Sequence, residues 1–235
     1  MTRLLPGYAW LPLAGVLAVN TLVYNGTRII NAGRMHFSMW TAVDDVIPFV
    51  TATAFIYVLA FVQWGIGYLL AGRESPEVCM RFYMADICAK GIALIFFLAV
   101  PTMITRPEVT GEGLFDALTR LIYRIDAPDN LFPSIHCLES WICFRSALSL
   151  KKVPRWYAPA SLVFTLLVFA STVMLKQHVF VDIPGGVFAA EAGLILSDAL
   201  QLGRRSVSSK AVRPVFKKGS LYGKQGETDP AGKAD

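Results

Sequence analysis

Two histidines stand at the borders of apolar segments, and each has a polar neighbour suited to phosphoryl chemistry. His178 and Asp182 are four residues apart, so on a helix they would share one face. A carboxylate in that position accepts a hydrogen bond from one imidazole nitrogen, which fixes the tautomer and leaves the other nitrogen free to act as a nucleophile. His136 occupies a similar border earlier in the chain, and it could donate a proton to a leaving oxygen.

Donors for an anion adjoin the two histidines. Arg106 follows an apolar run and precedes a proline, which would hold its planar guanidinium near the membrane surface for a bidentate phosphate contact. Lys176 lies two residues before His178, and Ser134 is placed to cap a helix that begins at Ile135, whose first free N–H groups attract anions. The set predicts phosphoryl transfer without a metal or another cofactor.

The segments that carry these residues are apolar enough to cross a bilayer. The chain has 235 residues, of which 54% are hydrophobic and 17% charged, more apolar and less charged than a soluble domain. A bilayer core needs about 20 apolar residues per helix. We therefore predict an all-α integral membrane protein with six transmembrane helices, at residues 8–24, 49–71, 86–104, 135–150, 156–175 and 179–200. Between the third and fourth, leucines and isoleucines of residues 114–125 recur at helical spacing and predict an amphipathic helix at the membrane interface.

The distribution of basic residues predicts the orientation of these spans. Lysines and arginines gather between the fourth and fifth spans and after the sixth, so both termini should face the cytoplasm. With an even number of spans, the two histidine segments share the opposite, non-cytoplasmic face. We expect one membrane domain at residues 1–205, a basic disordered tail at residues 206–235, and residence in the plasma membrane. The net charge of +5 is local, so the expected partners are membrane lipids and a lipid phosphate substrate, and no nucleic acid.

Other polar residues receive structural interpretations or none. Asp86 and Lys90 form an i, i+4 pair that we expect to neutralise itself near an interface. Asp44 and Asp45 could cap the second span or join the substrate site. Residues 73–81 are predicted to form a short polar turn. His36 is expected to be solvated, and the four cysteines to be free thiols. The sequence assigns no partner to three charged residues within the spans: Glu139, Arg145 and Glu191.

Three of these segments resemble the motifs of a known family. The sequence Pro-Ser-Ile-His at 133–136 and the pair His178 and Asp182 resemble the second and third motifs of the type 2 phosphatidic acid phosphatase family, and Arg106 with its proline resembles the end of the first. This family has a six-span fold and dephosphorylates lipid phosphates outside the membrane through a phosphohistidine. Across residues 106–186, the resemblance implies that His178 is the nucleophile, Asp182 its partner and His136 the general acid. It also implies that Arg106 and Ser134 bind phosphate.

The chain departs from the family pattern at three positions. Ala99 stands where the first motif has a lysine, Ile135 where the second usually has a glycine, and Thr172 where the third has an arginine. Lys176 is the expected substitute, and its place is similar to that of a base in the sphingomyelin synthase and inositol phosphorylceramide synthase branch. Residues 44–49 also resemble that branch, whose members transfer a phosphate headgroup to an alcohol.

Four functions therefore stand as hypotheses. The first is a lipid phosphate phosphatase that hydrolyses a phosphomonoester or pyrophosphate, and the second is a headgroup transferase of the same fold. A zinc-dependent hydrolase would use His136, His178 and Asp182 as ligands, but the nearby bases favour an anion. A non-enzymatic lipid carrier is the fourth. The sequence leaves open the lipid, the acceptor and the oligomeric state.

Overall fold

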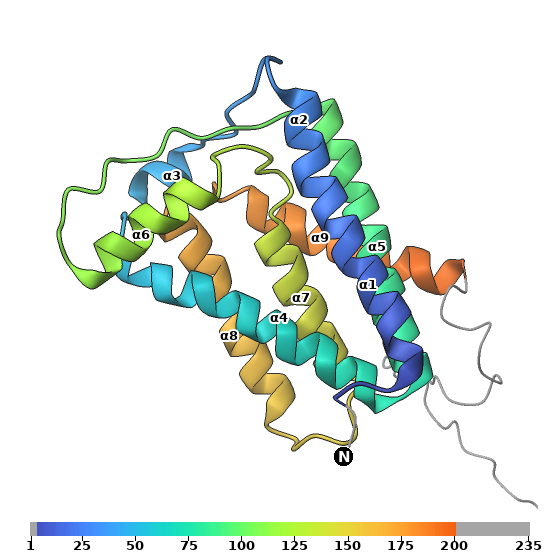
Figure 1. The fold of residues 1–235 in the computed structure, drawn as a ribbon. Helices are drawn as coiled ribbons and strands as arrows, with labels where there is room; N and C mark the ends of the chain where they lie inside the picture. The colour runs from blue at the N-terminus through green and yellow to red at the C-terminus, as the bar shows by residue number, and fades with distance from the viewer. Residues whose placement is uncertain (1–3, 201–235) are drawn as a thin grey trace, which may run out of the picture.

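The computed structural model describes residues 4–200, and the regular elements in that range are helical (Figure 1). The first helix is continuous over Gly7–Asn31 and comprises α1 (Gly7–Thr21), a π-helical turn (Leu22–Gly26) and α2 (Thr27–Asn31). The remaining elements are α3 (Ala42–Val46), a 3-10 turn (Thr51–Thr53), α4 (Ala54–Glu74), α5 (Pro76–Ala99), α6 (Leu114–Ile125), α7 (Ile135–Ala147), α8 (Tyr157–Met174) and α9 (Asp182–Ala199). The predicted tail at 206–235 lies outside the described residues.

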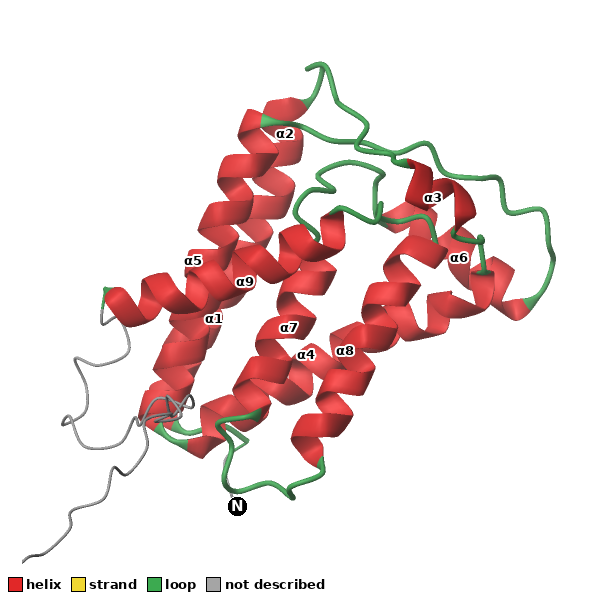
Figure 2. Ribbon diagram, turned by 180° about the vertical axis from the view of Figure 1, so that it is seen from behind, coloured by secondary structure: helices red, strands yellow, loops and turns green. Residues whose placement is uncertain are grey.

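Four helices within residues 4–200 are long and apolar enough to cross a membrane, and they indicate an integral membrane protein. They are Gly7–Asn31, Thr51–Glu74, Pro76–Ala99 and Tyr157–Met174. The prediction of six such helices is therefore met only in part. The helix α7 has 13 residues, and α9 carries three acidic residues in 18. Figures 1 and 2 show α7 between its neighbours in the middle of the bundle, where a helix covered by protein does not need a uniformly apolar surface.

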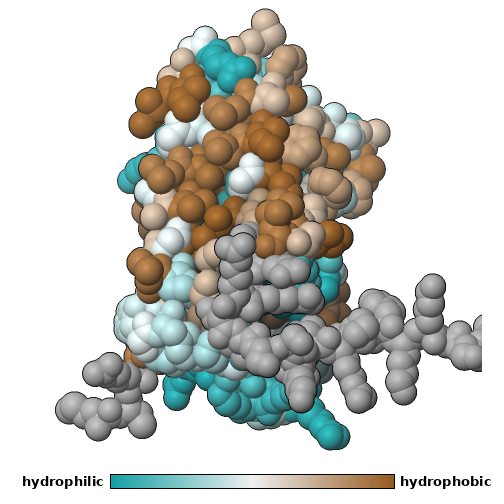
Figure 3. All heavy atoms as spheres, turned by 90° about the vertical axis from the view of Figure 1, so that its right-hand side faces the viewer, coloured by the Kyte–Doolittle hydropathy of each residue, from teal (hydrophilic) through white to brown (hydrophobic). Residues whose placement is uncertain are grey.

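The outer surface of the bundle is apolar. Large hydrophobic side chains are exposed on α1, α4 and α8, among them Leu11, Leu17, Phe55, Phe61, Val163 and Leu166. In Figure 3 brown hydrophobic residues cover much of one side, and hydrophilic residues gather at its lower end. Soluble monomers rarely expose continuous apolar patches of this kind, whereas a lipid-facing surface requires one.

The third long helix begins ten residues before its predicted start at residue 86. Ser75 caps it by accepting a hydrogen bond from the Val78 N–H at 3.3 Å, and Pro76 occupies its first position, a common start signal. The predicted polar turn at 73–81 is thus wrong. Asp86 and Lys90 consequently lie in the middle of α5 with exposed fractions of 0% and 1%, not near an interface.

Buried charges of the spans pair with one another across helices. The Lys90 Nζ lies 2.7 Å from Asp86 Oδ2 and 2.5 Å from Glu139 Oε1, and the Tyr68 hydroxyl donates to the other Glu139 oxygen. This cluster joins α4, α5 and α7. Arg145 pairs with Glu191, which also accepts from the Trp141 indole at 2.6 Å, and so joins α7 to α9. Glu139, Arg145 and Glu191, which have no partner assigned from the sequence, therefore pair between helices and help to position them.

The predicted helix at 114–125 is confirmed as α6. It buries Thr119 and Ile122, and Ile122 packs with Ala54, Tyr57 and Leu175. Its Leu114, Leu121 and Ile125 are exposed. The helix α6 thus covers the start of α4 with one side and presents apolar residues outward with another, as an interfacial helix would.

Candidate functional site

A cavity of about 520 Å³ lies among α1, α4, α6 and the chain segments that enter α7 and α9. Its volume falls in the ordinary range for a ligand site. Most of the lining surface is apolar, although half of the lining residues have polar side chains. These polar residues are Asn20, Tyr24, Tyr57, Arg106, Asp126, Asp129, Asn130, His136, Gln177 and His178.

His178 is held by Asp182. The Nδ1 atom lies 3.1 Å from Asp182 Oδ2, which also accepts the Val179 N–H at 3.0 Å. The sequence predicted that His178 and Asp182 share one face of a helix. The helix α9 begins only at Asp182, so His178 lies in the turn before it. Its backbone N–H, like that of Gln177, donates to the Thr172 carbonyl, and these bonds fix the turn. The remaining ring nitrogen, Nε2, is left for the cavity.

His136 faces His178 from the first turn of α7. The ring centroids are 6.1 Å apart, close enough for both rings to reach one phosphoryl group. Tyr57 stacks on His136 with centroids 4.1 Å apart, and Trp64 lies 5.0 Å away by the same measure. Two segments that are distant in sequence thus converge on one cavity.

Arg106 lines the cavity, and its guanidinium is only partly hydrogen-bonded. Nη1 donates to the carbonyls of Tyr123 and Asp126 at 3.2 and 2.6 Å, and the group lies over the Tyr123 ring. Within residues 4–200, its buried Nε and Nη2 atoms have no hydrogen-bond partner. Burial lowers the pKa of the guanidinium, but the ordinary value above about 12 keeps it charged. In an arginine, Nε and Nη2 together form an edge that suits two parallel hydrogen bonds to a carboxylate or phosphate.

Two predicted phosphate ligands lie elsewhere. Lys176 Nζ donates to the carbonyls of Asp44 and Ile47 at 2.8 and 2.7 Å and lies over the Trp40 ring. It is not among the residues that line the cavity in the described part of the chain. Ser134 is fully buried and caps α7, as predicted, by accepting the Cys137 N–H at 3.3 Å. Ile135 lines the cavity.

Seven of the ten polar residues that line the cavity were not predicted from the sequence, among them Tyr57, Asp126 and Gln177. The Tyr57 hydroxyl donates to Asp126 Oδ2 at 2.6 Å and lies 3.4 Å from His136 Nδ1. Gln177 is 1% exposed, and neither of its amide atoms has a partner within the described residues. Nothing in the sequence marks Asp126 as a site residue, and the single signal for Gln177 is its place next to His178.

Asp126 receives hydrogen bonds on both carboxylate oxygens, from Tyr24 and Tyr57. Burial by itself raises the pKa of the carboxyl, but the neighbouring His136 imidazole and the two tyrosine hydroxyls outweigh it and hold the pKa below its usual range. A carboxylate fixed in this way orients Tyr57 against His136. Its backbone carbonyl meanwhile holds Arg106.

Asp44 and Asp45 belong to α3 and do not cap the second span. The buried Asp44 accepts the Thr41 N–H through Oδ2 and the Phe180 N–H through Oδ1 at 2.6 Å. Asp45 accepts the Trp40 indole N–H at 2.8 Å. The α3 segment therefore holds the turn that contains His178 from its outer side.

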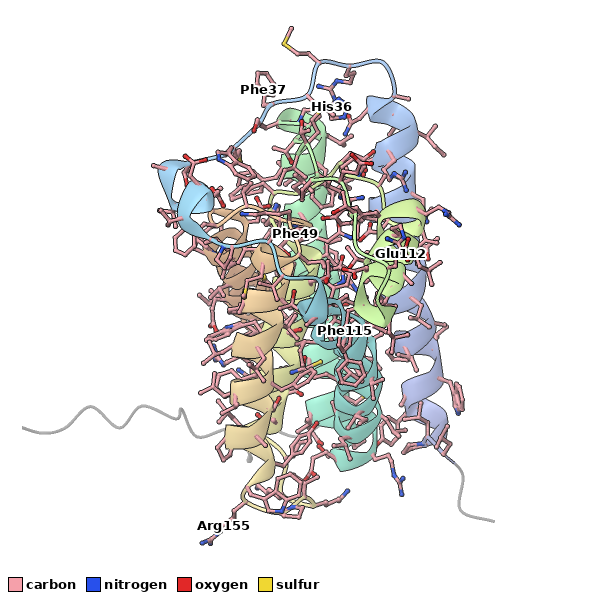
Figure 4. All side chains as sticks on the ribbon, turned by 90° about the vertical axis from the view of Figure 1, so that its left-hand side faces the viewer. His36, Phe37, Phe49, Glu112, Phe115 and Arg155 are labelled. Carbon is pink, nitrogen blue, oxygen red and sulfur yellow. The ribbon has the colours of Figure 1, made fainter. Side chains whose placement is uncertain are left out.

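The third histidine lies apart from the cavity. His36 contacts the Arg34 carbonyl at 3.0 Å, and Figure 4 shows it beside Phe37 near one end of the molecule, with Arg155 at the other end. The structure thus separates His36 from His136 and His178.

The chain matches no protein-family model, and no curated protein matches it. In the part of the chain that the structure describes, no group of three or more His, Cys, Asp or Glu side chains could hold a metal ion. Functional assignment therefore rests on the geometry of the cavity.

Proposed function

We propose that this chain is a membrane lipid phosphate phosphatase that hydrolyses a lipid phosphomonoester or pyrophosphate through a phosphohistidine on His178. One observation carries the proposal. His178 has its Nδ1 bonded to Asp182 and faces His136 in a cavity that Arg106 also lines, and two nitrogens of Arg106 have no hydrogen-bond partner in residues 4–200. A nucleophile, a proton donor and an anion clamp are thereby available to one phosphoryl group.

The proposed reaction has two steps, formation of a phosphohistidine and its hydrolysis. The Nε2 lone pair of His178 attacks phosphorus, the bond from phosphorus to the leaving oxygen breaks, and His136 protonates that oxygen. Asp182 stabilises the charged imidazole through Nδ1. Water then attacks the phosphohistidine and gives its proton to His136. The nitrogen–phosphorus bond breaks, and phosphate and both histidines are regenerated.

The phosphate oxygens are bound by groups that have no other partner in residues 4–200. The Nε and Nη2 atoms of Arg106 supply a bidentate contact, and the Gln177 amide supplies a further donor. The first N–H groups of α7, at Ile135 and His136, add the positive end of a helix. Lys176 and Ser134 do not bind the phosphate themselves. Lys176 stabilises the turn that contains His178, and Ser134 caps the helix α7 that carries His136.

The proposed membrane arrangement has six crossing helices, with α7 and α9 on the inside. We place the site on the non-cytoplasmic side of the plasma membrane, because His136 lies at the start of α7 and the basic loop that contains Arg155 follows the other end of this helix. A helix of 13 residues spans only about 20 Å, so α7 begins below the surface. His136, in the first turn of α7, therefore lies below the surface as well.

A headgroup transferase of the same fold is the second candidate. Lys176 and residues 44–49 both resemble the synthase branch, and the structure joins them, because Lys176 Nζ bonds to the carbonyls of Asp44 and Ile47. A lipid or polyol hydroxyl would then replace water in the second step.

Phosphate release by the detergent-purified protein tests the proposal. The substrates are phosphatidic acid and a polyprenyl pyrophosphate, with a chelator present. We expect His178→Ala to abolish release and His36→Ala, a matched loss of a histidine away from the cavity, to retain it. Wild-type protein given ³²P-labelled substrate should form an acid-labile phosphoenzyme. Near-normal turnover by His178→Ala would exclude the proposed nucleophile.

Other outcomes identify the competing functions. Turnover that requires an added alcohol would indicate the transferase. Activity lost with chelator and restored by zinc would indicate a metal hydrolase. Lipid movement across vesicles by His178→Ala, without phosphate release by the wild type, would indicate a carrier.

A further inference from the structure

A second cavity, of about 470 Å³, lies between α1 and α4. Its walls are mostly apolar, with Leu5, Leu13, Leu17, Phe61 and Leu69 among the lining residues. It shares Asn20, Phe61 and Trp64 with the catalytic cavity. The two spaces therefore adjoin, and we refer to the second as the α1–α4 groove.

The groove closes at the end farthest from the catalytic cavity. There Leu5 and Ala9 pack against Gly72, whose missing Cβ would lie 2.8 Å from Leu5 Cδ2. From this contact α1 and α4 diverge toward the catalytic cavity, as Figures 1 and 2 show. Between Gly7 and Asn20 the wall formed by α1 is roughly 20 Å long, compared with about 15 Å for half of a bilayer core.

The charged residues in the groove wall do not contradict an apolar occupant. Lys90 and Glu139 line the groove, but they are 1% and 4% exposed and are bonded to each other at 2.5 Å. The ammonium group also binds Asp86. The pair therefore presents almost no free charge to the groove.

We propose that the α1–α4 groove binds one extended hydrocarbon chain of the lipid whose phosphate occupies the catalytic cavity. This inference rests on the proposed function. The continuity of the two cavities identifies the occupant, because a chain that leaves the headgroup passes Phe61 and Trp64 and enters the groove directly. Its length favours a single chain that extends beyond the bilayer midplane over two acyl chains side by side.

The neck between the cavities also links chain binding to catalysis. Trp64 donates to Ser140 Oγ at 3.0 Å, which fixes the indole, and its ring lies 5.0 Å from that of His136. Phe61 meets the same imidazole edge-on with centroids 5.6 Å apart. A chain in the neck would pack on the rings that hold His136 and exclude water from them.

Gly65 provides a variant that fills the groove without disturbing the helix. It lines the groove, and a Cβ built there meets nothing within 4 Å. Gly91 on α5 has the same open surroundings but does not line either cavity in the described residues. Gly65→Trp is therefore the test and Gly91→Trp its matched control, with melting temperatures to confirm that both fold.

The first measurement compares long and short substrates with the same headgroup, 1-oleoyl-lysophosphatidic acid against glycerol 3-phosphate and farnesyl pyrophosphate against isopentenyl pyrophosphate. We expect Gly65→Trp to lower kcat/KM for the long substrate about tenfold, the effect of leaving roughly two methylene groups unburied. The short substrate and Gly91→Trp should be unaffected. An equal loss on short and long substrates, or no loss on either, would overturn the proposal.

The second measurement does not require turnover. A long-chain alkyl phosphate with a terminal diazirine is photolysed with the protein, and the labelled peptides are mapped by mass spectrometry. We expect label on α1 and α4 near Leu13 and Leu69, its loss in Gly65→Trp and its retention in Gly91→Trp. Such labelling without phosphate release would refute the proposed phosphatase activity but support chain binding in the groove. Labelling that is unchanged in Gly65→Trp would refute chain binding in the groove, whatever the activity.

Discussion

Replacement of Arg106 by lysine separates the geometry of its guanidinium from its charge. In the structure Nη1 is committed to the Tyr123 and Asp126 carbonyls, and Nε and Nη2 remain for the phosphate. A lysine keeps the positive charge but carries its donors on one nitrogen instead of on a planar group of three nitrogens. It cannot hold the α6 carbonyls and two phosphate oxygens together.

The structure allows an estimate of the loss. Two charge-assisted bonds to phosphate become at most one, and each such bond contributes about 1.5–3 kcal/mol. The loss of one bond corresponds to a decrease in kcat/KM of about 10- to 150-fold. The release of the two carbonyls should also lower the melting temperature, because these contacts attach the loop of Arg106 to α6.

The assay measures kcat/KM for phosphate release and, separately, the protection of the folded protein by inorganic phosphate or vanadate. Arg120 is the matched control, since its guanidinium also binds carbonyls, those of Val109 and Gly111, but it does not line the cavity in the described chain. We expect Arg106→Lys to lose both turnover and anion protection, and Arg120→Lys to retain them. A lowered melting temperature with unchanged kcat/KM and protection would show that Arg106 is structural only, and the clamp assignment would fail.

Two further predictions concern residues that act through the catalytic pair. Lys176→Met removes buried hydrogen bonds to two carbonyls and should lower the free energy of unfolding by about 3 kcal/mol. It should also reduce kcat and leave inhibition by phosphate unchanged. Weaker phosphate binding at an unchanged melting temperature would instead show that Lys176 is a phosphate ligand. The pKa of Asp126 is lowered in the folded protein, so its stabilising contribution is present above the unfolded pKa of about 4 and is lost as the pH falls through the folded value. The melting temperature of Asp126→Asn should therefore fall less steeply below pH of about 4 than that of the wild type; parallel curves would contradict this.

The sequence predicts the long helices well and their boundaries less well. A bilayer requires apolar runs of nearly fixed length, so hydropathy alone finds the helices ending at Glu74 and Met174 to within a few residues. The predicted start of α5 is wrong because charged residues such as Glu77 and Arg81 suggest a polar turn, whereas Ser75 and Pro76 are the signals that start the helix. Hydropathy also overestimates the number of lipid-facing spans, since it cannot distinguish an interior helix such as α7 from an outer one.

At the site, the sequence predicts the residues with strong local patterns and misses those supplied by tertiary packing. The parity of the spans brings His136 and His178 to one face, and the structure places them in one cavity. No sequence pattern indicates in which direction a side chain in a loop or on a helix points. Lys176 has a positive φ of 52° and reaches the α3 carbonyls instead of the cavity, and Tyr57 is one aromatic residue in an apolar run that nothing in the sequence marks as a neighbour of His136.

What holds the two histidines together must also come from tertiary packing, because helices in lipid gain little from apolar contact with one another. The first turn of α9 meets the first turn of α7 at Gly186, where an added Cβ would lie 2.6 Å from the Ser134 carbonyl oxygen and 2.8 Å from Cys137 Cβ. The same approach lets the Ser134 N–H donate to the Asp182 carbonyl at 3.3 Å. The backbone of the residue that orients His178 is thus bonded directly to the cap of the helix that carries His136. A close contact that only glycine permits therefore sets the spacing on which the proposed proton transfer and nucleophilic attack depend.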